Sequence, residues 1–185
     1  MPDINGIPYV ESSDLVSAYP AASQALAQEV SDQLASKLDL AGGKILQIVR
    51  ATDSTQRTTT STSFVDADIS VTITPQKSNS AILLIWTANV FVTGTDAGTL
   101  FGRVTITDNS NNSLVGNRAS IGSVNITITG TAENLHTFTL VGYSTPATTS
   151  ATTYKGRMLS GSASTTMRVR NDEYTGQLYA IEVSA

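Results

Sequence analysis

The sequence predicts a mainly β protein, an antiparallel jelly-roll sandwich of about ten strands preceded by one N-terminal α-helix. From residue 44 onward, short apolar or alternating segments recur about every 8–14 residues between turns rich in Thr, Ser and Gly, a pattern typical of sandwiches and barrels. Residues 17–43 instead show a helical pattern that ends at two glycines. The sequence contains no visible repeat, which argues against a propeller or a solenoid.

Residues 1–13 form a short polar segment with an Asn-Gly turn signal at Asn5-Gly6, followed by Ile-Pro-Tyr-Val. The segment has no partner of its own in the sequence pattern. Chain termini are usually loose unless something ties them down. We therefore expect either a loose tail or an arm that becomes ordered on another molecule.

Residues 14–41 are predicted to form an amphipathic helix, in which Pro20 suits the first turn and Gly42 and Gly43 stop the helix. Its apolar residues recur at every fourth position along one side of the helix, and the opposite side is polar. Two packings remain open. Three copies could form a bundle if a trimeric domain held them together, or the helix could fold back on its own sheet. The apolar row consists of Leu26, Ala27, Val30, Leu34 and Leu38.

Residues 42–185 are predicted to form the sandwich. The segment 81–92 is apolar on both faces and is predicted to be a buried central strand, whereas 67–75 alternates and buries one face. The segment 52–64 is predicted to be a polar connection or an extended edge. The predicted strands are 44–52, 67–75, 81–92, 99–107, 113–121, 123–129, 134–143, 152–159, 165–171 and 177–183.

Composition excludes several classes of function. The net charge is −4 and the sequence has no basic stripe, so we expect no nucleic-acid partner. No apolar run reaches the roughly 18 residues of a membrane span, so we expect no membrane insertion. The chain has no Cys, and its N-terminus lacks the pattern of a secretory signal. Charged residues make up only 14%. An uncharged polar surface suits contacts with copies of itself or with glycans, although it also describes an ordinary solvated β surface.

Catalysis and metal binding have little support in the sequence. The single histidine, His136, lies in a predicted strand, and the few carboxylates include Asp66, Asp68, Asp172 and Glu173. Paired acids could hydrolyse a glycan, but enzymes of that kind in phage tails are usually long β-helices, and nothing here repeats. Oxygen-rich segments at 66–68 and 107–112 could bind Ca²⁺, but turn chemistry explains them equally well. We expect no catalytic residue, no metal site and no cofactor.

Three segments of residues 42–185 resemble phage and prophage fibre-tip domains. They are "GGKILQIVRATDSTQRTTTSTSFVDADISVTITPQKSNSAILLIW", "STPATTSATTYKGRM" and the closing "LYAIEVSA". The resemblance implies a C1q/TNF-like jelly roll that assembles as a homotrimer. The segment "INGIPYVESSDLVSAYPAASQALAQEVSDQLASKLD" is similar to the arm and helix that begin many phage fibre and minor tail proteins, where they join the fibre to the particle. No long shaft separates the two parts here.

These observations predict a virion structural protein, a short trimeric fibre on the exterior of a phage particle. Its N-terminal arm would attach to another virion protein of the tail, baseplate or capsid, and its jelly roll would be displayed, for instance to a host-surface glycan. The alternatives are a capsid decoration or head-fibre protein and, from different classes, a small glycan-hydrolysing enzyme or a secreted C1q-like binding module. The expected arm residues are Ile4, Ile7, Pro8, Tyr9 and Val10, and the expected receptor-facing loop residues are Thr95, Asp96, Asp108, Asn109, Asn111 and Asn112.

Four tyrosines lie late in the chain, at Tyr143, Tyr154, Tyr174 and Tyr179. Tyrosine combines a large apolar area with a polar hydroxyl, which suits an interface or a glycan platform. The same residues are also common in ordinary β-sheets. The sequence leaves these two interpretations open.

Overall fold

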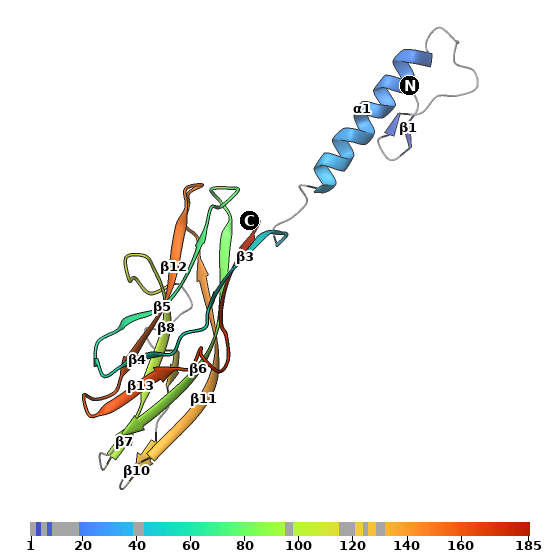
Figure 1. The fold of residues 1–185 in the computed structure, drawn as a ribbon. Coiled ribbons are helices and arrows are strands. Elements are labelled where there is room, and N and C mark those ends of the chain that lie inside the picture. The colour runs from blue at the N-terminus through green and yellow to red at the C-terminus, as the bar shows by residue number, and fades with distance from the viewer. Residues whose placement is uncertain are drawn as a thin grey trace. The chain divides into compact units, whose positions relative to one another are not determined.

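The computed structural model describes residues 3–4, 7–8, 19–38, 43–94, 98–114, 121–123, 126–128 and 132–185. The chain divides into two compact units, Met1–Ala41 and Gly42–Ala185 (Figure 1). Each unit is described by itself below.

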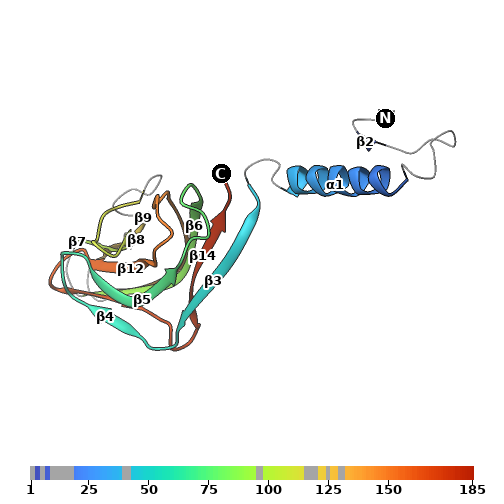
Figure 2. The same cartoon turned by 90° about the horizontal axis from the view of Figure 1, so that it is seen from above.

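The first unit contains a small hairpin and one helix. Strands β1 (Asp3–Ile4) and β2 (Ile7–Pro8) pair antiparallel, with Ile4 opposite Ile7. This register is that of a hairpin with a two-residue loop, which Asn-Gly favours. Helix α1 (Tyr19–Leu38) carries Pro20 in its first turn, and β2 lies beside it (Figure 2). The predicted N-terminal helix is therefore confirmed, with its described bounds inside the expected 14–41.

The second unit is a sandwich of two antiparallel sheets. In the larger sheet β6 (Ala81–Gly94) is central, with β11 (Ala132–Ser144) on one side and β14 (Gly176–Val183) followed by β3 (Ile45–Asp53) on the other. Further along β6, β13 (Thr165–Val169) replaces β14 as its neighbour and pairs in turn with β4 (Arg57–Thr59). The smaller sheet has the order β5 (Val65–Ile73), β12 (Thr152–Ser160), β8 (Gly102–Asp108) and β9 (Ile121–Ser123).

The connections give the sandwich its jelly-roll topology. The successive strands β5, β6, β8, β11, β12 and β14 alternate between the smaller and the larger sheet. As a result, strands distant in sequence pair with each other, β3 with β14, β5 with β12 and β6 with β11. A double sheet wound in this way is a jelly roll, which confirms the predicted fold class (Figure 2).

The core lies between the two sheets and explains one of the two apolar sides of segment 81–92, the side that points inward. Alternate residues of β6, from Ile82 through Trp86 to Val92, are fully buried, and Val71 and Ile73 of β5 are buried in the same core. Burying a side chain of this size stabilises the fold by about 1.5–3 kcal/mol. The backbone at Gly156 packs so closely against the core that a Cβ at this position would lie 2.9 Å from the Trp86 ring.

Two of the predicted strands differ from the structure. The segment predicted as 99–107 consists of β7 (Gly98–Leu100) and β8, separated at Phe101. The Phe101 carbonyl accepts a hydrogen bond from Gly161 N at 2.8 Å, next to the last β8–β12 pair of Gly102 with Ser160. Strand β8 pairs with β12, whereas β7 pairs with another strand, so the break marks a change of partner. In the segment predicted as 113–121, Ser113 forms only an isolated bridge with Thr107, while 115–120 lie outside the described residues. Strand β9 begins at Ile121, and β7 pairs with β10 (Ile126–Ile128).

The sandwich has two distinct ends. At one of them, here called the proximal end, the chain enters and also finishes, since Gly43 N donates a hydrogen bond to Ser184 O at 2.8 Å. Strand β6 begins at this end, where Ala81 pairs with Val183. At the opposite, distal end β6 finishes at Gly94, which pairs with Ala132 and Thr165.

Candidate functional site

The outer side of the larger sheet carries a continuous apolar surface near the proximal end. Directly paired residues share one side of a sheet, and residues two apart on a strand share it too. One outward row runs Ile48, Ile181, Leu83, Tyr143, and the next runs Arg50, Tyr179, Ile85, Val141. We call this surface the apolar face; it consists of Ile45, Ile48, Leu83, Ile85, Val141, Tyr143, Tyr179, Ile181 and Val183.

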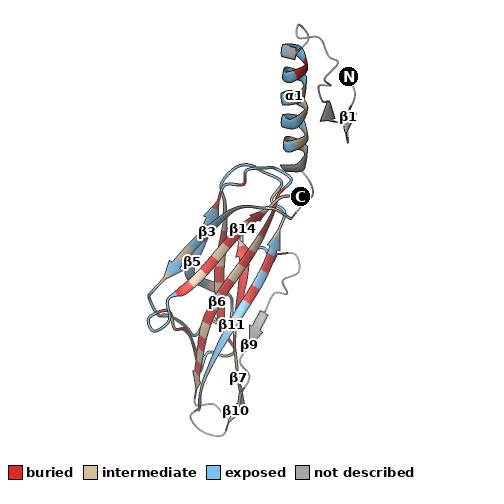
Figure 3. Ribbon diagram, turned by 90° about the vertical axis from the view of Figure 1, so that its right-hand side faces the viewer, coloured by how far each residue is buried: buried red, intermediate tan, exposed pale blue. Residues whose placement is uncertain are grey.

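Much of the apolar face is open to solvent in the single chain. Ile48 is 57% exposed, Val141 50% and Tyr143 44%. Figure 3 shows these less buried positions alternating with buried ones along the strands of this sheet. Contiguous exposed apolar surface of this kind marks an interaction site more often than isolated apolar residues do.

The apolar face gives way to polar residues toward the distal end. The next outward row contains Thr87, Thr139 and Gln177. Beyond it, the guanidinium groups of Arg168 and Arg170 lie 5.6 and 5.5 Å from the centre of the Phe91 ring. Leu135, which pairs with Phe91 and is 46% exposed, is an apolar residue on this distal part, but the continuous apolar rows lie where the chain enters the sandwich.

The outer side of the smaller sheet is charged instead. Asp66 lies 3.4 Å from Lys155 Nζ and 3.0 Å from Arg157 Nε, and Arg57 Nη1 lies 3.1 Å from Asp68. These groups are arranged beside a β-bulge between Lys155 and Arg157. The carboxylates of Asp66 and Asp68 are 45% and 61% exposed, so water solvates them, and the ion pairs need no partner to cover them.

The predicted helix row lies open in the single chain. Val30 is 47% and Leu34 58% exposed, Leu26 is half-buried and Ala27 is exposed. Leu38 is the last helical residue, and its side chain lies outside the described set.

Part of the predicted arm lies in the hairpin. Ile4 belongs to β1, and Ile7 and Pro8 form β2. Tyr9 and Val10 lie outside the described residues. The structure therefore shows a paired backbone for the arm's first part.

The strands that precede the two predicted receptor-facing loops end at opposite ends of the sandwich. Asp108 ends β8 at the proximal end, paired with Tyr154, and Asn109, Asn111 and Asn112 follow it. Thr95 and Asp96 lie outside the described residues, and the last residue described before them, Gly94, ends β6 at the distal end.

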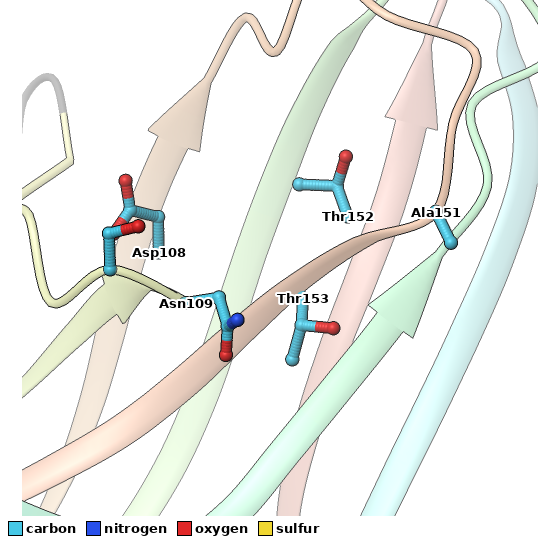
Figure 4. A pocket seen from close by; sticks show the side chains of 6 residues that line it. Asp108, Asn109, Ala151, Thr152 and Thr153 are labelled. Carbon is cyan, nitrogen blue, oxygen red and sulfur yellow. The ribbon is translucent and has the colours of Figure 1, made fainter.

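The loop after β8 lines a polar pocket of about 260 Å³ (Figure 4). The Asp108 carboxylate closes the loop itself, accepting hydrogen bonds from Asn112 N at 2.8 Å and Asn112 Nδ2 at 2.9 Å. The other wall is formed by the start of β12, which is distant in sequence but pairs with β8 in the smaller sheet. The lining residues are Asp108, Asn109, Ser110, Ala151, Thr152 and Thr153.

The candidate catalytic groups are engaged in structural contacts. Asp66 and Asp68 line a pocket of about 200 Å³ together with Lys155, and each carboxylate pairs with a cation. Asp172 lies 3.7 Å from Arg170 Nε. His136 is exposed and stacks on Phe138, with ring centres 6.0 Å apart. Within the described residues, no group of three or more His, Asp or Glu side chains is arranged to hold a metal ion.

Two carboxylates that the sequence did not single out hold the fold together. Glu182 is fully buried at the proximal end and accepts hydrogen bonds from Gln76 N at 2.8 Å and Gln47 Nε2 at 2.5 Å. Burial alone would raise the pKa of Glu182, but the hydrogen bonds outweigh burial and lower this pKa. Asp53 behaves in the same way: burial opposes its charge, but bonds from Arg57 and Asn171 lower its pKa.

The four late tyrosines have different environments. Tyr143 and Tyr179 belong to the apolar face, whereas Tyr154 is fully buried in the core and Tyr174 is 50% exposed in a turn. The sequence alone does not distinguish Tyr143 and Tyr179, which lie on the outer side, from Tyr154, which lies in the core; the pairing of the strands does.

Within the described residues, no helix is long and apolar enough to span a membrane. The sequence matches no protein-family model, and no curated protein matches it. Among solved structures, the chain is similar to a protein of the infectious bursal disease virus particle, with 20% identity, 77% of this chain and 38% of that chain covered, and a TM-score of 0.35. It is also similar to the VP2 protein of the same virus in derived T=1 particles, with 15% identity, 74% and 36% coverage, and a TM-score of 0.33. The chain thus spans less than two-fifths of the length of these proteins.

Proposed function

We propose that this protein is a virion structural protein, a short homotrimeric fibre on the exterior of a phage particle. The observation that carries the proposal is the apolar face of the larger sheet, which two further copies of the chain would cover. The resemblance of the sequence to phage fibre tips supports the virion role. The outer side of the larger sheet is apolar, whereas the outer side of the smaller sheet is charged. This contrast favours an assembly in which each copy buries the first side and exposes the second.

The helix would add a second contact between the three copies. Its row of Leu26, which is half-buried, and Val30 and Leu34, which are exposed, provides an apolar stripe at every fourth residue. About two and a half heptads are too few to hold a coiled coil alone. Three sandwiches held together would raise the effective concentration of the three helices and so stabilise a bundle.

The N-terminal segment serves as the attachment end in this proposal. Residues 1–13 would bind another virion protein of the tail, baseplate or capsid. Because the chain enters the sandwich at its proximal end, the distal end is the end available for display. Host-surface binding would therefore use the distal end, where β6 finishes at Gly94, rather than the loop after Asp108.

The first test is the oligomeric state of the full chain by size-exclusion chromatography with light scattering. We expect a trimer at micromolar concentration. A stable monomer at that concentration contradicts the proposal.

The second test concerns attachment. Deletion of residues 1–13 is expected to leave the trimer intact and to abolish incorporation into particles. Unchanged incorporation would place the attachment surface elsewhere.

A capsid decoration or head-fibre role uses the same trimer and the same arm on a different part of the particle. Electron microscopy of purified virions with labelled protein distinguishes tail from capsid. The small glycan hydrolase and the secreted C1q-like module are the alternatives from other classes. A glycan-cleavage assay with Asp66→Asn, Asp68→Asn and Asp172→Asn tests the enzyme, since turnover that these variants remove would favour it.

A further inference from the structure

Two surfaces would lie outside the proposed trimer contact: the outer side of the smaller sheet, which is already buried in the single chain at Thr105, Thr107 and Leu159, and the distal end. Phe101 and Arg103 lie where these two surfaces meet. Phe101 joins β7 to β8, and Arg103 follows in β8 opposite Leu159 of β12. Both residues are half-buried, whereas Leu159 is buried.

The Phe101 ring is fixed by a close approach of the backbone. A Cβ on Gly161 would lie 2.5 Å from the ring, so only glycine fits there. Gly161 N also donates a hydrogen bond to the Phe101 carbonyl at 2.8 Å. The Arg103 guanidinium lies 4.9 Å from the ring centre, a cation–π distance, so the ring holds the guanidinium in place.

Within the part of the chain that the structure describes, Arg103 differs from its neighbours because no carboxylate pairs with it. Lys155 and Arg157, on the same side of the smaller sheet, each have the Asp66 carboxylate within 4 Å. Among the described residues, no carboxylate forms an ion pair with Arg103. Its planar set of N–H donors suits a carboxylate or a phosphate, and because the stack already orders it, binding costs less conformational entropy.

We propose that Arg103, positioned by Phe101 and Gly161, is a binding site for the anionic groups of an acidic surface polysaccharide. The inference rests on the proposed fibre function. Three identical sites in a trimer would engage a polymer that repeats its charge, so that weak single contacts add up. The net charge of −4 disfavours general adhesion to polyanions, so retention on such a polymer requires a local site of this kind.

The test measures binding of the full-length trimer to three immobilised polymers by biolayer interferometry. Polygalacturonate carries carboxylates, poly(glycerol phosphate) carries phosphodiesters and dextran is neutral. We expect binding to at least one acidic polymer and none to dextran. Comparing the two acidic polymers shows whether the site binds a carboxylate or a phosphodiester. Arg103→Gln is expected to weaken binding at least tenfold, and Arg103→Lys less, since lysine keeps the charge but loses the planar donors.

Two further variants make the test specific. Lys155→Gln removes one positive charge from the same side of the same sheet and is expected to change binding less than twofold. Phe101→Leu keeps an apolar side chain but removes the aromatic stack, and it should weaken binding in the same direction as Arg103→Gln. Each variant is first shown to be a folded trimer.

Three results overturn the inference. They are no binding to either acidic polymer, equal binding to dextran, and equal losses in Arg103→Gln and Lys155→Gln. If the trimer persists in these cases, the fibre proposal stands without this site. If the wild-type chain is a monomer, the fibre proposal itself fails.

Discussion

The two outer sides of the sandwich are built by the same alternation of residues yet differ in chemistry. On the larger sheet the outward positions near the proximal end are Ile, Leu, Val and Tyr, while on the smaller sheet they include Asp66, Lys155 and Arg157. Both sheets bury their inner side in one common core. The core therefore does not explain the difference, whereas the trimer contact proposed above would explain it.

The distribution of charge supports the same interpretation. Only 14% of the residues are charged, and several of these form ion pairs around β5 and β12. The apolar face contains one charged neighbour, Arg50, which lies on β3 at the margin of the sheet. Covering this face with a second copy would thus bury few charges and incur little desolvation penalty.

The largest effect should come from placing a charge on the apolar face. Ile48→Asp leaves the single chain folded, because Ile48 is 57% exposed there. Within a trimer interface the new carboxylate would be buried without a partner, at a cost of roughly 3 kcal/mol per copy or more. We expect light scattering to show monomers with an unchanged β-sheet circular dichroism spectrum.

Ser70→Asp is the matched control for that substitution. Ser70 is exposed on β5 and pairs with Lys155, so a carboxylate there is solvated and lies beside a cation. This variant should remain trimeric. Trimers of Ile48→Asp, or monomers of Ser70→Asp, would show that the apolar face is not the interface.

The next effect separates the core from the apolar face. Leu84 is fully buried, whereas Val141, on the neighbouring strand β11, is 50% exposed. Leu84→Ala should lower the free energy of unfolding by about 2–5 kcal/mol. Val141→Ala should leave the unfolding of the isolated chain within about 1 kcal/mol and act on trimer dissociation instead. Denaturant unfolding and concentration-dependent light scattering measure the two quantities, and equal effects on unfolding would contradict the division.

The sequence predicts elements better than it predicts surfaces. The buried strand 81–92 and the helix around Leu26 are visible because each pattern is local and regular. The apolar face is not visible, because Ile48, Leu83 and Tyr143 are adjacent only through the pairing of strands far apart in the chain. The segments at Thr95 and Asp108 have similar turn compositions in the sequence. The strands before them nevertheless finish at opposite ends of the sandwich, which only the strand pairing shows.

A smaller effect should appear in acid, at the proximal end beneath the apolar face. The pKa of Glu182 is lowered in the folded chain, so its contribution is fully present above the unfolded value near 4.5 and is lost as the pH falls through the folded pKa. Glu182→Gln should cost about 1–3 kcal/mol at pH 7. The difference between wild type and variant should shrink below about pH 4.5. Urea unfolding at a series of pH values checks this, and a difference that is constant down to pH 3 would show that the carboxylate charge plays no part.

The smallest effect is expected on the charged side of the smaller sheet. Asp66 pairs with Lys155 and Arg157, but its side chain is 45% exposed, so water already solvates the carboxylate. Asp66→Asn should therefore change the free energy of unfolding by less than about 1 kcal/mol, and by less still in high salt. Unfolding in 0.1 M and 1 M NaCl measures both values. If Asp66→Asn were as costly as Glu182→Gln, these ion pairs would be holding the smaller sheet together, and the charged side would contribute to folding as much as the buried carboxylate does.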